Sequence, residues 1–156
     1  MAISSKLKSF LDKEDVEYQV QEHPLAYTAQ EVAGEQHIPG KQMVKSVIVK
    51  SGDHFMMCVL PAIHLIDFDK LKALVGNGDI SLADEEEIAK LFPDYEVGAE
   101  PPFGHIYGLE VFADRKLQES EEIAFNAGTH TDVVKMKFKD YLRLANPKLA
   151  DIGTHI

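Results

Sequence analysis

Apolar and polar positions alternate along the chain with two different periods, and these periods predict its helices and strands. A period of three to four residues predicts helices over residues 5–16, 28–34, 68–75, 85–92 and 139–145. Two-residue alternation or a short apolar run predicts strands over residues 18–21, 43–50, 55–60, 106–113, 122–125 and 132–138.

Residues that favour turns and helix ends set several of these boundaries. The segment 28–31, Thr-Ala-Gln-Glu, has the spacing of a capping box at the start of a helix. Asp67 is suited to cap the next helix, which we expect to end at Gly76. The segment 81–84 offers another capping arrangement before a short helix that Pro93 closes.

The order of these elements predicts an α+β fold. Residues 43–50 and 55–60 flank the turn Ser51-Gly52-Asp53 and are typical of a hairpin of two largely buried strands. Several strands are hairpin neighbours, which favours a mixed, mainly antiparallel β-sheet flanked by helices over a doubly wound parallel sheet. The length allows one well-buried core, so we expect residues 1–156 to form a single domain.

Composition narrows the possible functions. The chain has 16 basic and 26 acidic residues and a formal charge of −10, which disfavours a sequence-independent grip on nucleic acid, so any such contact must be local. We expect no DNA partner. No apolar run approaches the roughly 20 residues that cross a bilayer, and no signal peptide is evident, so we expect a cytoplasmic protein without a membrane partner.

Lys45 lies within an apolar strand pattern at 43–49. Two-residue alternation places its side chain on the same side as Met43, Val47 and Val49, where a charge costs energy unless a partner or ligand meets it. Two interpretations stay open. The aliphatic stem extends along the apolar surface and the amine reaches water at a sheet edge, or the lysine marks a site for an anion or a carbonyl group.

Glycine-containing segments at 98–104 and 126–130 are the second candidate feature. Their backbone N–H groups are candidates to bind an anion or a polarised carbonyl, as in an oxyanion site. Neither segment matches a Walker or dinucleotide motif, and simple turns remain the alternative. His130 follows Gly128 in a turn expected to lie near the first segment, although it too could serve the turn alone.

The sequence gives little support for a catalytic nucleophile or for a metal site. Cys58, the single cysteine, lies in an apolar strand and fits a packing role in a reducing compartment. No Gly-x-Ser-x-Gly motif is present, which disfavours a covalent serine hydrolase. Seven histidines occur, but none are spaced as metal ligands on one element, so we expect no metal and no cofactor.

Three motifs together resemble a known family. The order and spacing of residues 43–47, 98–104 and 126–130 are similar to those of the YbaK/prolyl-tRNA-synthetase-associated domain. That family comprises free-standing deacylases and the editing insertion of bacterial prolyl-tRNA synthetases. The resemblance runs from about Ser5 to Tyr141.

The resemblance implies hydrolysis of the ester that joins a wrong amino acid to the terminal ribose of a tRNA. It implies that Lys45 holds the terminal nucleotide and orients the ester. The family's Gly-x-x-x-Pro motif maps to Gly98 and Pro102, which together with Lys45 are the expected catalytic residues. The same resemblance gives the expected substrate-binding residues as Ala99, Glu100, Pro101, Phe103, Gly104, Gly128, Thr129 and His130. Threonine at 129 stands where serine is common in the family.

An aminoacyl ester is already activated, so catalysis can depend on orientation and on donors aimed at the developing oxyanion. The substrate's own 2′-hydroxyl is a candidate to assist the attacking water. The expected partner is the CCA end and acceptor stem of a mischarged aminoacyl-tRNA carrying Ala, Ser, Thr or Cys, with an aminoacyl-tRNA synthetase as a further candidate. Few phosphates would be neutralised, so we expect weak affinity with a shallow salt dependence.

Two other functions remain open. The first is a non-catalytic module of the same fold that binds an aminoacyl-tRNA end or a synthetase. The second, with little support in the sequence, is a metal-dependent hydrolase whose activity a chelator would abolish. Neither the amino acid removed nor the tRNA can be read from single residues, because one methylene changes discrimination by only about 1–3 kcal/mol.

Overall fold

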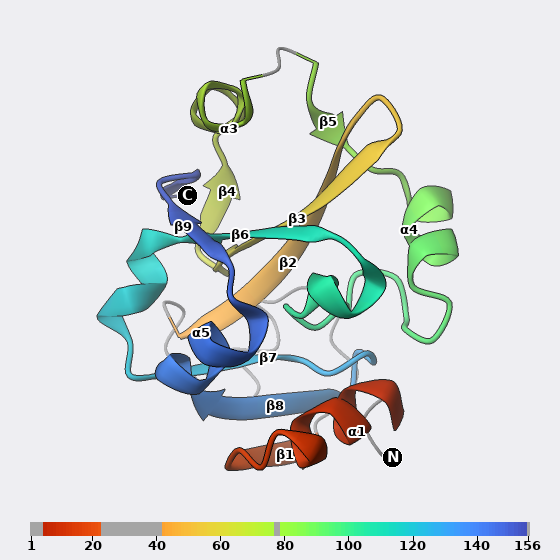
Figure 1. The fold of residues 1–156 in the computed structure, drawn as a ribbon, viewed down its shortest axis with the longest axis vertical. Coiled ribbons are helices and arrows are strands. Elements are labelled where there is room, and N and C mark those ends of the chain that lie inside the picture. Colours follow the sequence, from red (N-terminus) through yellow and green to blue (C-terminus); the bar gives the residue numbers. More distant parts are fainter. Residues whose placement is uncertain (1–4, 23–41, 77–78, 156) are drawn as a thin grey trace.

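A mixed β-sheet with helices on both faces forms the centre of the computed structural model, which describes residues 5–22, 42–76 and 79–155 (Figure 1). The described helices are α1 (Ser5–Lys13), α3 (Phe68–Val75), α4 (Glu85–Leu91) and α5 (Phe138–Ala145), with short 3-10 helices η1 (Gly104–Tyr107) and η2 (Arg115–Glu119). The described strands are β1 (Tyr18–Glu22), β2 (Met43–Ser51), β3 (His54–Pro61), β4 (His64–Ile66), β5 (Ser81–Leu82), β6 (Glu110–Asp114), β7 (Glu122–Asn126), β8 (Asp132–Lys137), β9 (Lys148–Ala150) and β10 (Gly153–His155).

The main sheet has the strand order β1-β8-β7-β2-β3-β6-β9, with β5 attached to β2. Strands β4 and β10 form a separate antiparallel pair. The pairs β2–β7, β3–β6 and β6–β9 are parallel, while β1–β8, β7–β8, β2–β3 and β2–β5 are antiparallel. The predicted α+β fold with a mixed, mainly antiparallel sheet is therefore confirmed.

Strand β2 holds a central place in this sheet and changes neighbour along one edge. On its other edge it forms the predicted hairpin with β3, from the pair Val44 and Pro61 to the pair Ser51 and His54. On the edge opposite β3, β7 pairs only with Met43 and Val44, and β5 pairs only with Val49 and Lys50. Among the described strands, none pairs with residues 45–47 on this edge, so the sheet opens there. We call this opening the split.

Each face of the sheet packs against its own set of apolar residues. On one face, Val44 and Ile48 of β2 belong to a core shared with α1 and α5. On the opposite face, Val49 packs with Cys58 of β3 and Leu71 of α3. Helices therefore cover both faces, and alternate residues of β2 point into different cores.

Several helix ends follow from single residues, as predicted. The Asp67 side chain accepts hydrogen bonds from the N–H groups of Asp69 and Lys70, and α3 ends at Gly76, whose φ of 76° is in the left-handed region. At α4 the cap is Asp84, which forms a capping box with Glu87. The capping arrangement expected within 81–84 is therefore confirmed at Asp84, while Ser81 and Leu82 are paired with β2 as strand β5.

The predicted strand at 106–113 starts later than expected. Residues 104–107 form η1, and Gly108 ends that helix with a φ of 78°, so the strand begins only at Glu110. After β6 the chain continues into η2, where Asp114 accepts a hydrogen bond from the Lys116 N–H. The helix expected at 28–34 lies outside the described residues. None of the described helices is long and apolar enough to cross a membrane.

Candidate functional site

Lys45 occupies the position that the alternation predicted. Val47 and Val49 belong to the core on the α3 face, so Lys45 points to that face as well. Its side chain is half-buried, and this burial lowers the pKa of its ammonium group below the ordinary value of 10.5. Within the described part of the chain, no carboxylate forms an ion pair with it. A cation therefore lies in a partly apolar setting without a described counter-charge.

The end of β7 lies beside Lys45. Val44 and Phe125 are the last parallel pair of β2 and β7, and both belong to the core on the α1 and α5 face. The next residues, Lys45 and Asn126, therefore both point to the α3 face, each one residue beyond that last pair. Lys45 is thus the first residue of the split, and Asn126 is the last residue of the strand that borders it.

The chain that follows β7 is bonded to the glycine and proline segment. The Gly128 N–H donates to the Ala99 carbonyl (2.9 Å), and the Glu96 N–H donates to the Gly128 carbonyl (2.8 Å). The predicted proximity of the segment 126–130 to the segment 98–104 is therefore confirmed. This arrangement brings together two motifs that are separated by about 30 residues in sequence.

His130 makes a second connection between the same segments. Its backbone N–H donates to the Glu96 carboxylate at 2.7 Å, and its imidazole Nε2 lies 2.8 Å from the Val97 carbonyl oxygen. Since a carbonyl can only accept, Nε2 carries the proton. The ring packs against Gly98, where a Cβ would lie 3.4 Å from the His130 Cε1, and the φ of +90° at Gly98 is one that L side chains rarely adopt.

Glu100 is a buried carboxyl within this loop and is only 5% exposed. Its Oε2 accepts a hydrogen bond from the Gly98 N–H at 2.7 Å. Burial raises the pKa of Glu100 to about 7, while backbone N–H groups, led by that of Gly98, and the nearby His130 act in the opposite direction. The side chain therefore stabilises the loop from within, and its contact with substrate stays a prediction.

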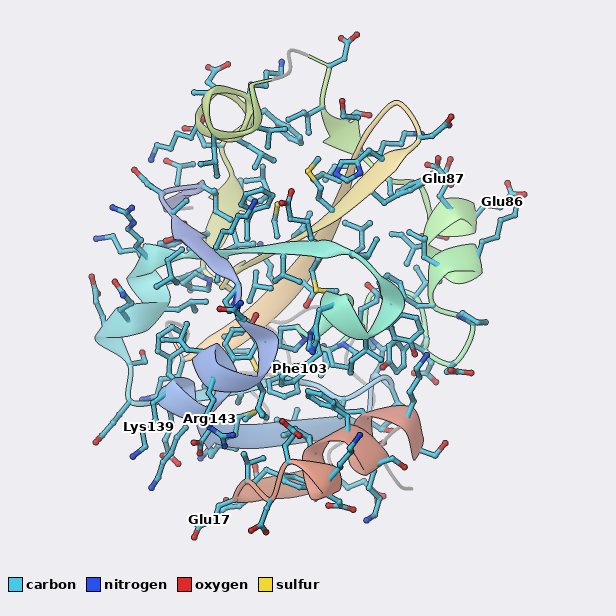
Figure 2. All side chains as sticks on the ribbon, in the orientation of Figure 1. Glu17, Glu86, Glu87, Phe103, Lys139 and Arg143 are labelled. Atoms are coloured by element: carbon cyan, nitrogen blue, oxygen red, sulfur yellow. The ribbon has the colours of Figure 1, made fainter. Side chains whose placement is uncertain are left out.

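The remaining residues of the loop are buried. Phe103 packs against Phe125 and Tyr141, with ring centroids 5.7 and 5.3 Å away, and Figure 2 shows its side chain inside the molecule. A Cβ at Gly104 would lie 3.1 Å from the Met57 sulfur. Phe103 and Met57 belong to the core on the face opposite Lys45. The predicted contact of Phe103 and Gly104 with substrate, like that of the buried Ala99, Pro101 and Pro102, is not tested by this packing.

Thr129 is held by its own turn. Its hydroxyl donates to the carboxylate of Asp132, which is fully buried at the start of β8, and it accepts from the Thr131 N–H at 3.3 Å. Serine has the same hydroxyl and could make the same bonds. The role of Asp132 was not anticipated from the sequence, although an acidic residue directly before an apolar strand is a signal that could have marked it.

Most backbone N–H groups of the two segments are already hydrogen bonded, which contradicts the expectation of unpaired donors. Bonds within the protein engage the N–H groups of Gly98, Ala99, Phe103, Ala127, Gly128 and His130. The N–H of Thr129 has no acceptor among the described residues. The segments therefore form an internal hydrogen-bonded network. The Lys45 ammonium and the Thr129 N–H are two donors at this end of the sheet that have no acceptor among the described residues.

Cys58 does not take part in this site. It is fully buried in β3, and burial raises the pKa of its thiol to about 12, which fits the predicted packing role. The described residues contain no group of three or more His, Cys, Asp and Glu side chains arranged to hold a metal ion. The expectation of a metal-independent reaction stays a prediction.

Not every predicted site residue is joined to the others. Within the described residues, no hydrogen bond or ion pair links Lys45 to the loop at 98–102. The connection runs through β7, since Asn126 lies beside Lys45 and the next two residues bond to Asp132 and Ala99. The candidate site is therefore the split, with Lys45 at its start and the loop and turn at its border.

Comparison with known proteins places this geometry in context. A model of the aminoacyl-tRNA editing domain family matches residues 23–144. The multifunctional Ser/Thr-tRNA deacylase ProXp-y of Escherichia coli K12 is 30% identical over 151 residues, covering 94% of this chain and 90% of that protein. The proline–tRNA ligase of Staphylococcus saprophyticus is 34% identical over 109 residues, which cover 68% of this chain but only 18% of the ligase.

Comparison with solved structures shows that the fold is shared with a known protein. A crystal structure described as a candidate trans-editing enzyme for prolyl tRNA synthetase superposes with a TM-score of 0.86. The alignment covers 99% of both chains at 24% identity. At this level of identity the likeness shows a shared fold.

Proposed function

Because this chain belongs to the aminoacyl-tRNA editing domain family, we propose that it is a trans-editing hydrolase that deacylates mischarged aminoacyl-tRNA carrying a small amino acid. Alanine, serine, threonine and cysteine are the candidate amino acids. The observation that carries the proposal is the half-buried Lys45, whose ammonium has no described counter-charge and lies at the split beside the end of β7. An anionic or carbonyl-bearing ligand would give this ammonium group the negative charge or hydrogen-bond acceptor that the described residues do not provide.

The proposed reaction is the hydrolysis of one ester bond. The water oxygen bonds to the carbonyl carbon of the amino acid, the bond from that carbon to the ribose oxygen breaks, and the ribose oxygen takes a proton. The Lys45 ammonium orients the terminal nucleotide and the ester. The Thr129 N–H is our candidate backbone donor for the developing oxyanion, because most neighbouring N–H groups are already bonded.

Gly98 and Pro102 enter this proposal as residues that shape the loop beside the ester. Gly98 allows the left-handed backbone on which His130 packs, and Pro102 lies buried where the loop turns toward the core. The proposed partner is the CCA end and acceptor stem of a mischarged tRNA. A synthetase partner and a cytoplasmic location agree with this role.

The test is the release of radiolabelled amino acid from Ala-tRNA, Ser-tRNA, Thr-tRNA and Cys-tRNA. Wild-type protein should hydrolyse one or two of these substrates, and Lys45→Ala should lose this activity by orders of magnitude. Lys50→Ala is the matched control on the same strand, because Lys50 is already paired with Glu87 at 2.8 Å. No hydrolysis of any substrate by folded wild-type protein would overturn the proposal and favour the non-catalytic binding module.

A further inference from the structure

A buried polar side chain without a partner lies directly beside Lys45. Asn126 is only 6% exposed, and its side-chain oxygen Oδ1 accepts no hydrogen bond from the described residues. It follows Phe125, the last residue of β7 paired with β2, so it shares the α3 face with Lys45. Its partner on β8 is the fully buried Val133.

Leaving this oxygen without a donor is costly. A buried acceptor without a hydrogen bond has lost its bonds to water without replacement, and an unsatisfied group of this kind in a native protein calls for an explanation. The turn that follows does not use this oxygen: the N–H groups of Ala127, Gly128 and His130 donate to other acceptors, and Oδ1 accepts no bond from the Thr129 N–H either. The acceptor is therefore free for a ligand at the split.

The surroundings restrict the chemistry of that ligand. Lys45 is on the same face, and both residues are one position beyond the last β2–β7 pair, so a second ammonium group, such as the α-amine of an amino acid, would be repelled there. Ala124, which precedes Asn126 on the same face, and Val133 are buried and small. A neutral donor on a small group fits this position better than a charged donor or a nucleoside.

From this geometry, and resting on the proposed function, we infer that the Asn126 Oδ1 accepts a hydrogen bond from the side-chain hydroxyl of the esterified amino acid. Asn126 is then a specificity-determining residue that selects serine over alanine, and threonine over an analogue without the hydroxyl. A site that provides a buried acceptor rejects such an analogue because the acceptor would be left unpaired. The preference should be at least about 10-fold in kcat/KM.

Two substrate pairs isolate the hydroxyl group. Ser-tRNA and Ala-tRNA differ only by this group, and so do Thr-tRNA and 2-aminobutyryl-tRNA, all prepared on one tRNA. We expect wild-type protein to hydrolyse the hydroxylated member of each pair faster. Asn126→Leu, which keeps the branched shape without the acceptor, should lower kcat/KM about 10-fold or more for the hydroxylated substrates and leave the other two nearly unchanged.

Two further variants serve as controls. Asn126→Asp retains an acceptor oxygen and should preserve the order of preference within each pair. Ser46→Ala removes another buried hydroxyl without a hydrogen bond among the described residues, but Ser46 lies on the opposite face of β2 between Val44 and Ile48. Its preference ratios should match those of the wild type. Thermal unfolding of each variant checks that it is folded.

The outcomes separate this inference from the proposed function. Equal rates within each wild-type pair, or an equal loss on all four substrates in Asn126→Leu, would overturn the assignment while leaving the deacylase intact. Should Asn126→Leu not fold, equal rates within each wild-type pair would still overturn the assignment, and Asn126→Ala would take the place of the leucine variant. Folded wild-type protein that hydrolyses none of the four would overturn the proposed function, and the assignment with it.

Discussion

The imidazole of His130 donates a hydrogen bond from Nε2 to the main-chain carbonyl of Val97 over 2.8 Å, which ties the turn after β7 to the loop at 96–104. We predict that His130→Ala lowers deacylation about 10-fold or more and destabilises the fold by about 1–3 kcal/mol, because the carbonyl loses its donor. His130→Gln should recover part of both losses, since its side-chain amide can donate to the same carbonyl. Measurements of kcat/KM and thermal unfolding check both effects, and full activity in His130→Ala would contradict the prediction.

Lys45 should be required for turnover but not for folding. Burial of its ammonium lowers its pKa, so the charge is held at an energetic cost. We therefore predict that Lys45→Met loses activity by orders of magnitude while its free energy of unfolding stays equal to, or exceeds, that of the wild type. Chemical denaturation beside the deacylation assay tests this, and a large loss of stability in Lys45→Met would count against it.

The pH dependence of stability should carry a contribution from Glu100. Because the pKa of its carboxyl is raised in the fold from 4.5 to about 7, the unfolded chain holds fewer protons between these values, and stability falls as the pH rises through this window. Glu100→Gln should remove this contribution while keeping an acceptor for the Gly98 N–H. The stability of the wild type relative to the variant should fall from pH 4.5 to 7, by at most on the order of 3 kcal/mol. A pH-independent difference would refute the assignment.

Gly98 should resist substitution because of both its backbone and its neighbour. Its φ is +90°, and a Cβ would meet the His130 ring at 3.4 Å. We predict that Gly98→Ala costs about 1–3 kcal/mol of stability and also lowers activity, because the loop must shift. Gly52→Ala is the matched control, since Gly52 has a φ of +60° in the β2–β3 turn with nothing within 4 Å. It should lose stability but keep its activity per folded molecule.

The salt dependence of tRNA binding should be shallow. The chain carries a net charge of −10, and contact limited to the CCA end would neutralise few phosphates. We predict a slope of magnitude about 1–3 when the logarithm of the affinity is plotted against that of the salt concentration. Binding measured between low and physiological salt tests this, and a much steeper slope would indicate an extended phosphate interface.

Local sequence signals predicted those parts of the fold that depend on local physics. Asp67 and Gly76 fix the ends of α3 through their own backbone and side-chain chemistry. The alternation around Lys45 placed its side chain correctly because strand geometry is set by neighbouring residues. Strands β4, β9 and β10 were missed because each has only three residues, too few to show a period.

The site depends on contacts between segments that are distant in sequence. For this reason the sequence alone could not predict which residues lie beside Lys45 or which backbone N–H groups are already bonded. The proximity of Asn126 to Lys45 follows from the register of β2 and β7, which are about 80 residues apart in the chain. The hydrogen bonds that engage the Gly98 and Gly128 N–H groups likewise require both loops to be in place. Motif resemblance identified these segments, but only the tertiary fold shows which of their donors remain available.

The burial of Cys58 makes the protein well suited to site-directed labelling. It is the single cysteine in the sequence, and it is fully buried with a thiol pKa of about 12. Maleimide and methanethiosulfonate reagents attack thiolates at the surface, so the folded wild-type chain should remain unmodified. A cysteine introduced at an exposed position such as Lys139 would then carry the only fluorophore or spin label, without prior mutation of the native thiol.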